Sequence, residues 1–230
     1  MPEDNDIRIA LSKCIISSSG IRMITAKNGK EQSRDKNVSS SSMYLVGTIA
    51  LAFAEIIKKG APDKKPIIVL GTDSRPTGLI LARAMNRILS AAGVSVRFLS
   101  IVPSPQIMAY AGQTKEIDGF AYITASHNPV GHNGFKGGFG DGCVFGGADS
   151  DEFNSLFKSL AENKDTPGRL VELSKSIKRK AIASIYEETD LRKNESAESY
   201  RAFTLRTITD FPKGPAQEAL INQIRPEARK

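Results

Sequence analysis

The chain has 230 residues, of which 40% are hydrophobic and 25% charged, and its formal net charge is +7. The apolar content is sufficient for a sizeable core, and the length fits one large domain or one domain plus a fragment. Lys and Arg are scattered, Trp is absent and only 7% of residues are aromatic. We therefore expect no nucleic-acid partner. The positive charge is compatible with an enzyme for anionic substrates, but for most of these residues we favour an ordinary solvated surface.

Cysteines and the amino terminus indicate the compartment. Cys14 and Cys143 are the only cysteines, and without a short metal-type spacing they predict neither a disulfide scaffold nor a zinc site. We expect both thiols to be reduced and buried. The acidic stretch 1–6 is not followed by the apolar segment of a signal peptide. No apolar run approaches the roughly 20 residues of a membrane span. A cytoplasmic protein that binds no membrane is expected.

The first elements in chain order are an early strand, a polar loop and a helix. The strand is expected over residues 7–16 and the polar loop over 25–42. Serines at the end of that loop are expected to cap the helix. Apolar residues with a 3.6-residue period predict the helix itself, and residues 58–60 suit its end, through the helix dipole and a left-handed cap. The apolar run 67–70 predicts a strand covered on both faces.

Further along, helices and strands continue to alternate. A helix is expected after the turn 73–78, and the glycine-rich stretch 137–147 favours a hairpin or an irregular crossing. The other expected elements are strands over 94–99 and 119–124, helices over 105–111 and 151–161, the latter capped by Asp149 or Ser150, and an amphipathic stretch over 200–208. Alternation at this spacing predicts parallel βαβ units and an α/β domain.

The most informative stretch is residues 123–136, Ile-Thr-Ala-Ser-His-Asn-Pro-Val-Gly-His-Asn-Gly-Phe-Lys. It combines a hydroxyl, two carboxamides and an ammonium group with both histidines of the chain, His127 and His132. It also follows the strand expected over 119–124. Open α/β folds place their chemistry in loops at the carboxyl ends of strands. The sequence therefore predicts a reactive loop here.

Three segments carry a resemblance to a known family. Residues 124–129 followed by 133–136 resemble the phosphoserine loop of the α-D-phosphohexomutases, which include the phosphoglucomutases and phosphomannomutases. Residues 18–22, Ser-Ser-Gly-Ile-Arg, resemble the family's amino-terminal Ser-Gly-x-Arg motif. Residues 71–78, Gly-Thr-Asp-Ser-Arg-Pro-Thr-Gly, resemble its Gly-x-Asp-x-Arg-x-Ser/Thr-Gly turn. The three occur in the family's order.

The resemblance implies a three-layer α/β/α fold with a mixed sheet, as the first domain of a four-domain phosphohexomutase. Domain I would cover residues 1–190, with the active-serine loop at 123–136. Residues 191–230 would be a helix and linker toward a truncated domain II. The family's metal loop, sugar-recognition loop and carboxyl-terminal phosphate loop have no counterpart in the sequence, so we expect a truncated chain that lacks the remaining mutase domains.

The resemblance also implies an isomerase of carbohydrate metabolism. It would transfer phosphate within a hexose phosphate, from the 1- to the 6-position, through a phosphoserine at Ser126. Mg²⁺ would bind an oxygen of that phosphoserine, and a glucose 1,6-bisphosphate-type activator would be needed. Glucose, mannose, glucosamine and pentose phosphates all remain possible substrates. The alternative is a truncated, catalytically inactive domain that binds phosphosugars or partners. A serine hydrolase is disfavoured because Gly-x-Ser-x-Gly is absent.

Roles of single residues follow from the same resemblance. Ser126 is the expected phosphate carrier, and Arg22 and Lys136 are expected to form a cationic pair near it. Lys136 would act as general acid or base beside the like charge of Arg22. His127 would orient the nucleophile, transfer a proton or simply pack in the loop. We expect Arg22, Ser126, Lys136 and Asp73 to converge at one rim of the sheet.

Supporting roles are expected for the residues around the nucleophile. Asn128 and Asn133 would fix the loop through local hydrogen bonds, and Gly134 would shape its turn. Asp73 and Arg75 are expected to form a structural ion pair that braces the loop. His132 is expected to be a solvent-facing turn residue.

Overall fold

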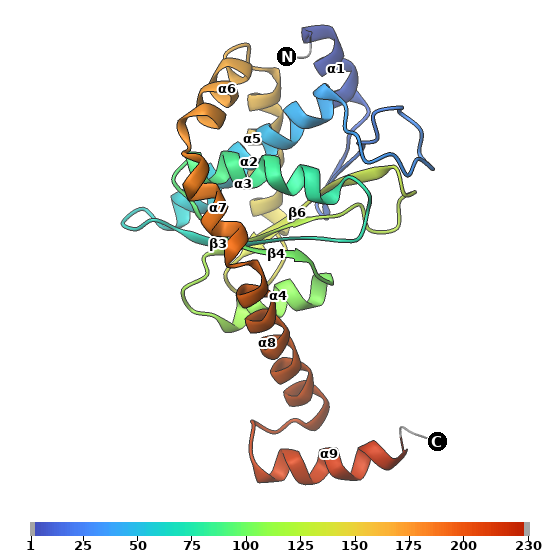
Figure 1. The fold of residues 1–230 in the computed structure, drawn as a ribbon, viewed down its shortest axis with the longest axis vertical. Coiled ribbons are helices and arrows are strands. Elements are labelled where there is room, and N and C mark those ends of the chain that lie inside the picture. Colours follow the sequence, from blue (N-terminus) through green and yellow to red (C-terminus); the bar gives the residue numbers. More distant parts are fainter. Residues whose placement is uncertain (1–2, 228–230) are drawn as a thin grey trace.

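A six-stranded mixed sheet lies between two layers of helices in the computed structural model, which describes residues 3–227 (Figure 1). The strands are β1 (Ile15–Ser17), β2 (Gly20–Ile24), β3 (Ile67–Thr72), β4 (Ser95–Ile101), β5 (Gly119–Ile123) and β6 (His132–Phe139). Their spatial order is β1-β2-β6-β5-β3-β4. The expected α/β/α fold with a mixed sheet is thereby confirmed.

The helices cover both faces of the sheet. They are α1 (Asp4–Ser12), α2 (Ser40–Gly60), α3 (Gly78–Ala91), α4 (Ser104–Gln113), α5 (Gly147–Glu162), α6 (Thr166–Ser176), α7 (Arg179–Glu187), α8 (Thr189–Thr209) and α9 (Pro215–Glu227). α2, α3 and α5 lie over one face, and α4 lies over the other, together with the first half of α8 (Figure 1). The end of α8 and all of α9 project away from the domain (Figure 1).

Strand direction gathers several loops at one edge of the sheet. β3 is parallel to β4 and β5, whereas β6 is antiparallel to both β5 and β2. β2, β3 and β5 therefore run the same way and end at the same edge, where β6 begins. This edge carries the loop 124–131 and the turn 73–77. The strand arrangement thus brings two of the three motifs together, as expected for the carboxyl edge of a parallel sheet.

Helix α2 forms the centre of the core. Ser39 caps it by accepting a hydrogen bond from the backbone N–H of Ser42 (3.1 Å), as predicted. It is long and apolar enough to cross a membrane, which our sequence analysis did not anticipate, yet 78% of its most apolar window is buried inside the domain. Phe53 is fully buried. The left-handed cap expected at the end of the helix is absent, since the C-cap residue Ala61 has φ −138°.

The amino-terminal strand predicted over 7–16 is wrong. Residues 4–12 form helix α1, and β1 begins only at Ile15. Ile7, Ala10 and Leu11, spaced three and four residues apart, pack on the core from one face of α1. Because this stretch is so short, a helical period and a poorly alternating strand were difficult to distinguish.

The second half of the chain also differs from expectation in places. A hairpin does follow β6, closed by a bridge between Gly138 and Val144. Helix α5 has Gly146 as its N-cap without a side-chain cap, so the predicted Asp149 or Ser150 cap is wrong. Ser150 is instead buried and donates to the carbonyl of Ser18 (3.3 Å). Helices α6 and α7 were not predicted. The expected boundary at 190 falls within the first turn of α8.

The two thiols have different environments. Cys14 is partly buried and donates to the carbonyl oxygen of Ala10 (3.4 Å), and burial raises its pKa to about 12. Cys143 is exposed, so the expectation that both thiols are buried is wrong for this residue. It lies in the irregular segment between β6 and α5.

Candidate active site

Ser126 lies in the loop that leaves β5 at the carboxyl edge of the sheet. Its backbone has φ +54°, in the left-handed region that side chains other than Gly and Asn rarely adopt. The residue is exposed, and its N–H donates to Oγ1 of Thr124 (3.0 Å). The hydroxyl is thus presented to solvent on a backbone whose conformation needs support from its surroundings.

Arg75 provides much of that support. Its side chain is only 12% exposed, and its Nε donates to Oδ2 of Asp73 (3.2 Å). The two terminal nitrogens donate to four backbone carbonyl oxygens of the loop, those of Pro129 (2.5 Å), His132 (3.1 Å), Ser126 (3.0 Å) and Asn128 (2.6 Å). The predicted Asp73–Arg75 ion pair is present. Arg75 also binds backbone carbonyls along the loop from Ser126 to His132.

Asp73 connects the guanidinium group of Arg75 to the end of strand β5. Its Oδ2 accepts a hydrogen bond from the hydroxyl of Thr124 (2.7 Å) as well as from Arg75, and its Oδ1 accepts from the backbone N–H of Arg75 (3.1 Å). Its own N–H donates to the carbonyl of Ile123 at the end of β5 (3.1 Å). The turn after β3 and the loop after β5 are therefore one hydrogen-bonded unit. Sequence analysis did not identify Thr124 as a part of it.

A second polar cluster, buried, holds the far end of the loop. Asn133 is fully buried and donates to the hydroxyl oxygen of Thr77 (3.1 Å), which also shares a hydrogen bond with the hydroxyl of Thr25 (2.9 Å). The Asn133 carboxamide oxygen accepts from the N–H of Gly134 (3.0 Å). This bond is local, but it reaches the next residue and is not the Asx-type bond that was expected of Asn133. Asn128, by contrast, enters the network through its backbone: its carbonyl accepts from Arg75, and its N–H donates to Ala125 (3.1 Å).

Gly134 is required by the packing of two strands. It pairs with Arg22 of β2, and a Cβ at this position would collide with the carbonyl oxygen of Ile21. Its carbonyl accepts a hydrogen bond from the N–H of Thr124 (3.2 Å). Gly134 thus allows β2 to approach the start of the loop closely.

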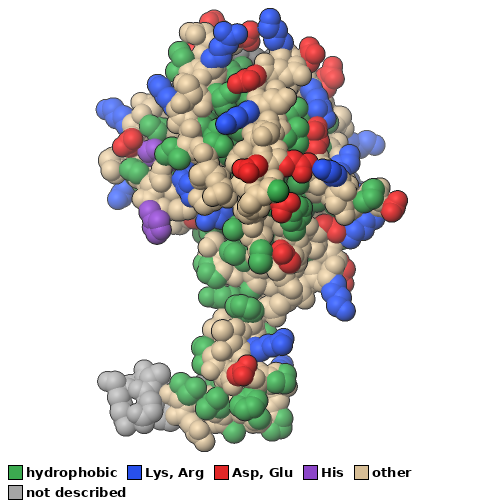
Figure 2. Space-filling model, turned by 180° about the vertical axis from the view of Figure 1, so that it is seen from behind, with side chains coloured by type: hydrophobic (Ala, Val, Ile, Leu, Met, Phe, Trp, Pro, Cys, Tyr) green, Lys and Arg blue, Asp and Glu red, His purple; other side chains and the backbone are tan. Residues whose placement is uncertain are grey.

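The prediction for His132 is wrong. The residue begins β6 and is only 6% exposed, because the loop around Glu31 covers it. Burial lowers the pKa of His132; the nearby Glu31 carboxylate opposes this shift, and Arg75 adds to it. Its Nδ1 has no hydrogen-bond partner among the described residues. His127 is exposed. Figure 2 shows Lys and Arg spread over this face of the domain and mixed with Asp and Glu.

Arg22 and Lys136 project from the same face of the sheet. Arg22 pairs with Gly134, and Lys136 follows Gly134 by two residues on β6. Since cross-strand partners share a face and alternate residues of a strand do too, the two cations are diagonal neighbours. Arg22 donates to the hydroxyls of Ser19 (2.9 Å) and Ser17 (3.3 Å). Within residues 3–227 neither cation bonds to the serine loop, and their convergence with Ser126 stays a prediction.

The described residues do not form a magnesium site. Among them, no three His, Cys, Asp or Glu side chains are grouped as a metal ion would require. Asp73 is the carboxylate joined to the loop, but its oxygens already accept hydrogen bonds from Arg75 and Thr124. A phosphoserine at Ser126 would offer Mg²⁺ only a single protein ligand.

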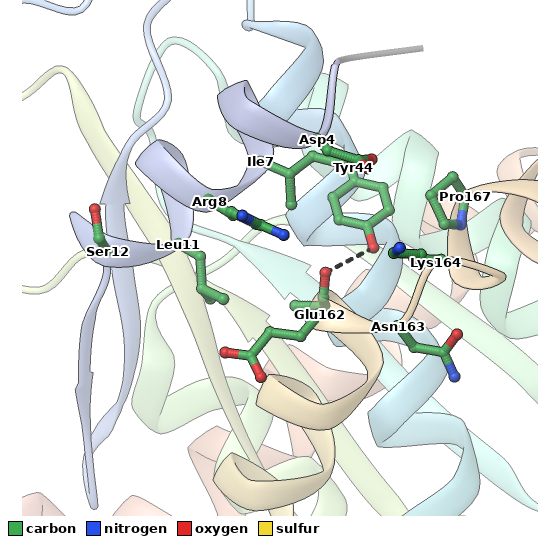
Figure 3. A pocket seen from close by; sticks show the side chains of 11 residues that line it. Asp4, Ile7, Arg8, Leu11, Ser12, Tyr44, Glu162, Asn163, Lys164 and Pro167 are labelled. Atoms are coloured by element: carbon green, nitrogen blue, oxygen red, sulfur yellow. Dashed lines mark hydrogen bonds between the residues drawn. The ribbon is translucent and has the colours of Figure 1, made fainter.

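A cavity of about 430 Å³ lies apart from these motifs, between α1, α2 and the α5–α6 turn (Figure 3). Its lining includes two cations, Arg8 and Lys164, and two acids, Asp4 and Glu162. The Tyr44 hydroxyl donates to the carbonyl of Ala161 (3.0 Å) at its edge. The mixed charges do not favour a particular ligand, and no motif residue lines the cavity.

Comparisons with known proteins identify the family of this domain. Residues 20–164 match the family model for the α/β/α domain I of phosphoglucomutase/phosphomannomutase. The phosphoglucosamine mutase of Acinetobacter baylyi is 36% identical over 118 residues, which are 51% of this chain and 26% of that protein. The phosphoglucosamine mutase of Rhodococcus erythropolis is 39% identical over 88 residues, 38% and 20% of the two chains.

A solved structure shows the same fold. A protein from Thermus thermophilus assigned as a phosphomannomutase superposes with a TM-score of 0.50 at 22% identity, over 63% of this chain and 30% of that one. The curated relatives above are matched over only 26% and 20% of their length. The chain therefore spans about a quarter of the proteins that it resembles.

Proposed function

The chain belongs to the phosphoglucomutase/phosphomannomutase family, matching its first α/β/α domain, and from this we propose that Ser126 carries phosphate in an intramolecular phosphotransfer on a sugar phosphate. The observation that supports the proposal is the placement of Ser126. Ser126 is an exposed residue with a left-handed backbone conformation. It lies at the carboxyl edge of the sheet, within the residues that match the family's domain I.

The reaction would proceed by two transfers through the same hydroxyl. Phosphoserine 126 first gives its phosphoryl group to a free hydroxyl of the sugar phosphate: the bond from phosphorus to Oγ breaks, the bond to the sugar oxygen forms, and that hydroxyl loses its proton. Oγ then takes the other phosphoryl group of the resulting bisphosphate, and the freed sugar oxygen regains a proton. A glucose 1,6-bisphosphate-type activator would load the serine.

Roles for the neighbouring side chains are part of the proposal. Phosphoryl transfer requires mainly positioning and charge neutralisation. Arg22 and Lys136 would supply positive charge, and Lys136 would exchange the proton with the sugar oxygen. His127, which is exposed and follows Ser126 in the chain, would be a second proton carrier. Any bound Mg²⁺ would require ligands beyond those that the described residues provide.

The names of two relatives support a proposal for the substrate class. Two are named phosphoglucosamine mutases, so we propose a hexose or hexosamine phosphate as substrate. We also propose a cytoplasmic location, where such metabolites are found.

Phosphate mapping tests the nucleophile. We would incubate the chain with glucose 1,6-bisphosphate and, separately, with glucosamine 1,6-bisphosphate, and locate phosphate by peptide mass spectrometry. Phosphate on Ser126, lost in Ser126→Ala and retained in Ser74→Ala, is the expected result. Ser74 is a suitable control because it is an exposed serine at the same edge of the sheet. A label on another serine that persists in Ser126→Ala would contradict the proposal.

The second candidate is a non-catalytic domain that binds phosphosugars or protein partners. It is favoured by one observation, that the chain spans only 26% and 20% of the curated relatives that it matches. Isothermal titration with glucose 1-phosphate separates the two functions. Saturable binding without phosphate on Ser126 under any of the conditions above would favour the second candidate.

A further inference from the structure

The five N–H groups of Arg75 are all engaged within the protein. We infer that Arg75, acting with Asp73 and Thr124, is a positioning clamp that holds Ser126 in its left-handed conformation, and that it does not bind the substrate's phosphate. The inference rests on the proposed function only in taking Ser126 as the nucleophile. The clamp concerns only the conformation of the loop, so it can be tested without an activity assay.

The donor inventory excludes a direct role in phosphate binding. A guanidinium group has five N–H donors and no acceptor. Nε of Arg75 donates to Asp73, and the terminal nitrogens donate to four loop carbonyls. No donor remains for a phosphate, and the side chain is only 12% exposed. Arginines that recognise phosphate frequently do so with two parallel N–H donors, and Arg75 has none to offer.

Both peptide groups that flank Ser126 are held by this clamp. Its N–H is bound by the hydroxyl of Thr124, which donates in turn to Asp73. Its carbonyl is bound directly by Arg75. Only the φ and ψ rotations of Ser126 lie between these two fixed groups, so the clamp determines where the Cα–Cβ bond points. The left-handed region is unfavourable for serine, and the conformation therefore persists because the surroundings impose it.

Lysine cannot replace arginine in this role. The acceptors around Arg75 are one carboxylate oxygen and four carbonyl oxygens that surround a planar fork. An ammonium group has three donors on one nitrogen and no planar geometry. Arg75→Lys would leave at least two of the five acceptors without a donor while keeping the charge. The substitution thus separates the effect of geometry from that of charge.

Amide hydrogen exchange of the whole chain tests the clamp. In Arg75→Lys, the amides of Ser126, Asn128 and His132 should exchange at least about tenfold faster, since each depends on a hydrogen bond that the clamp orders. Amides in the middle of β5 should keep their wild-type rates. Arg87→Lys is the matched control, because Arg87 is also half-buried and donates to a backbone carbonyl, that of Ser174, far from the loop.

Two outcomes would overturn the clamp. Unchanged exchange at Ser126 in Arg75→Lys would show that Arg75 does not hold the loop. Faster exchange spread evenly over all strands would show a general structural role. If Arg75→Lys does not fold, Thr124→Val decides the question: it removes only the hydroxyl that links Ser126 to Asp73, and unchanged exchange at Ser126 would contradict the inference.

Chemical rescue separates positioning from general stability. In Arg75→Ala, millimolar guanidinium, far below denaturing concentrations, should slow the exchange of the loop amides again, whereas methylammonium at the same concentration should not. Equal effects of the two cations would show that charge alone matters and would contradict the proposed geometry.

Phosphate labelling then distinguishes failure of the clamp from failure of the proposed function. If the wild-type chain is never labelled at Ser126, the proposed function is wrong. The hydrogen-exchange results then still test whether Arg75 holds the loop. If wild type is labelled, Arg75→Lys should lower the maximal labelling rate at least about tenfold and leave the half-saturating bisphosphate concentration unchanged. A raised half-saturating concentration with the maximal rate intact would mean that Arg75 binds phosphate.

Discussion

Single residues decide how closely the strands around the serine loop can approach. Gly134 sits where a Cβ would meet the carbonyl oxygen of Ile21, and Asn133 next to it is fully buried and hydrogen-bonded to Thr77. His132 completes the row with a buried imidazole. Three consecutive residues thus each satisfy a different physical constraint: close approach, buried hydrogen bonding and burial of a titratable ring.

Gly134→Ala should destabilise the domain by about 2 kcal/mol or more, because the added methyl group forces β2 and β6 apart. Urea unfolding would measure the loss. Gly146→Ala is the control, since nothing lies within 4 Å of a Cβ there. Similar unfolding midpoints for the two variants would contradict the close approach of the strands.

His132 should make stability depend on pH. Its folded-state pKa lies below the ordinary value of 6.5, so the unfolded chain binds a proton more readily. Stability should therefore fall as pH drops below about 6.5 and stop falling below the folded-state pKa, with a slope of at most about 1.4 kcal/mol per pH unit. Urea unfolding at several pH values would show this, and His132→Gln should remove that part of the slope. His127→Gln, an exposed control, should keep it; equal slopes in both variants would refute the assignment.

Among the elements, α2 contributes most to the core, whereas α7 only packs on it through Ile185 and Tyr186. α2 packs against α3 and α5, and its Phe53 ring meets Phe135 of β6 edge-on at 5.3 Å between centroids. α7 has no fully buried residue. Phe53 thus connects the central helix to the strand that leaves the serine loop.

Phe53→Ala should cost about 3–5 kcal/mol of unfolding free energy, through lost burial and the cavity left behind. Phe203→Ala in α8 is the matched control, because Phe203 is 47% exposed and should change stability by less than about 0.5 kcal/mol. Thermal and urea unfolding would compare them. A comparable loss in both variants would argue against α2 as the centre of the core.

For the molecule as a whole, we predict negligible mutase activity from this chain alone. The chain spans about a quarter of the curated relatives that it matches, and residues 3–227 hold no group of three His, Cys, Asp or Glu side chains that could bind a metal ion. Contacts to the substrate and the metal that the rest of a full-length mutase would make are then missing. Each such contact worth roughly 1.4 kcal/mol in the transition state changes the rate tenfold, and contacts of this kind act as a unit. A coupled assay would follow glucose 1-phosphate to glucose 6-phosphate with Mg²⁺ and glucose 1,6-bisphosphate. Turnover near that of an intact mutase, abolished in Ser126→Ala, would disprove the prediction.

Local signals in the sequence were sufficient for much of the fold. Helix α2, strands β3 to β5 and helices α3 and α4 were all predicted close to their observed positions, because apolar period and turn residues act within a few positions of one another. The short segment before β1 and the helices α6 and α7 were not, since their weak periods become decisive only when they pack on the domain. The serine loop was located by its motif and by its position after the predicted strand 119–124.

The sequence by itself determined which residues make up the loop, the ion pair of Asp73 with Arg75 and the α/β class. Only the tertiary structure decided that Arg75 binds four carbonyls of the loop, that Thr124 links Ser126 to Asp73, and that His132 is buried while Cys143 is exposed. The physical reason is that hydrogen-bond partners and burial depend on segments far apart in the chain. Arg75 and Ser126 are 51 residues apart, and strand order and direction place them together.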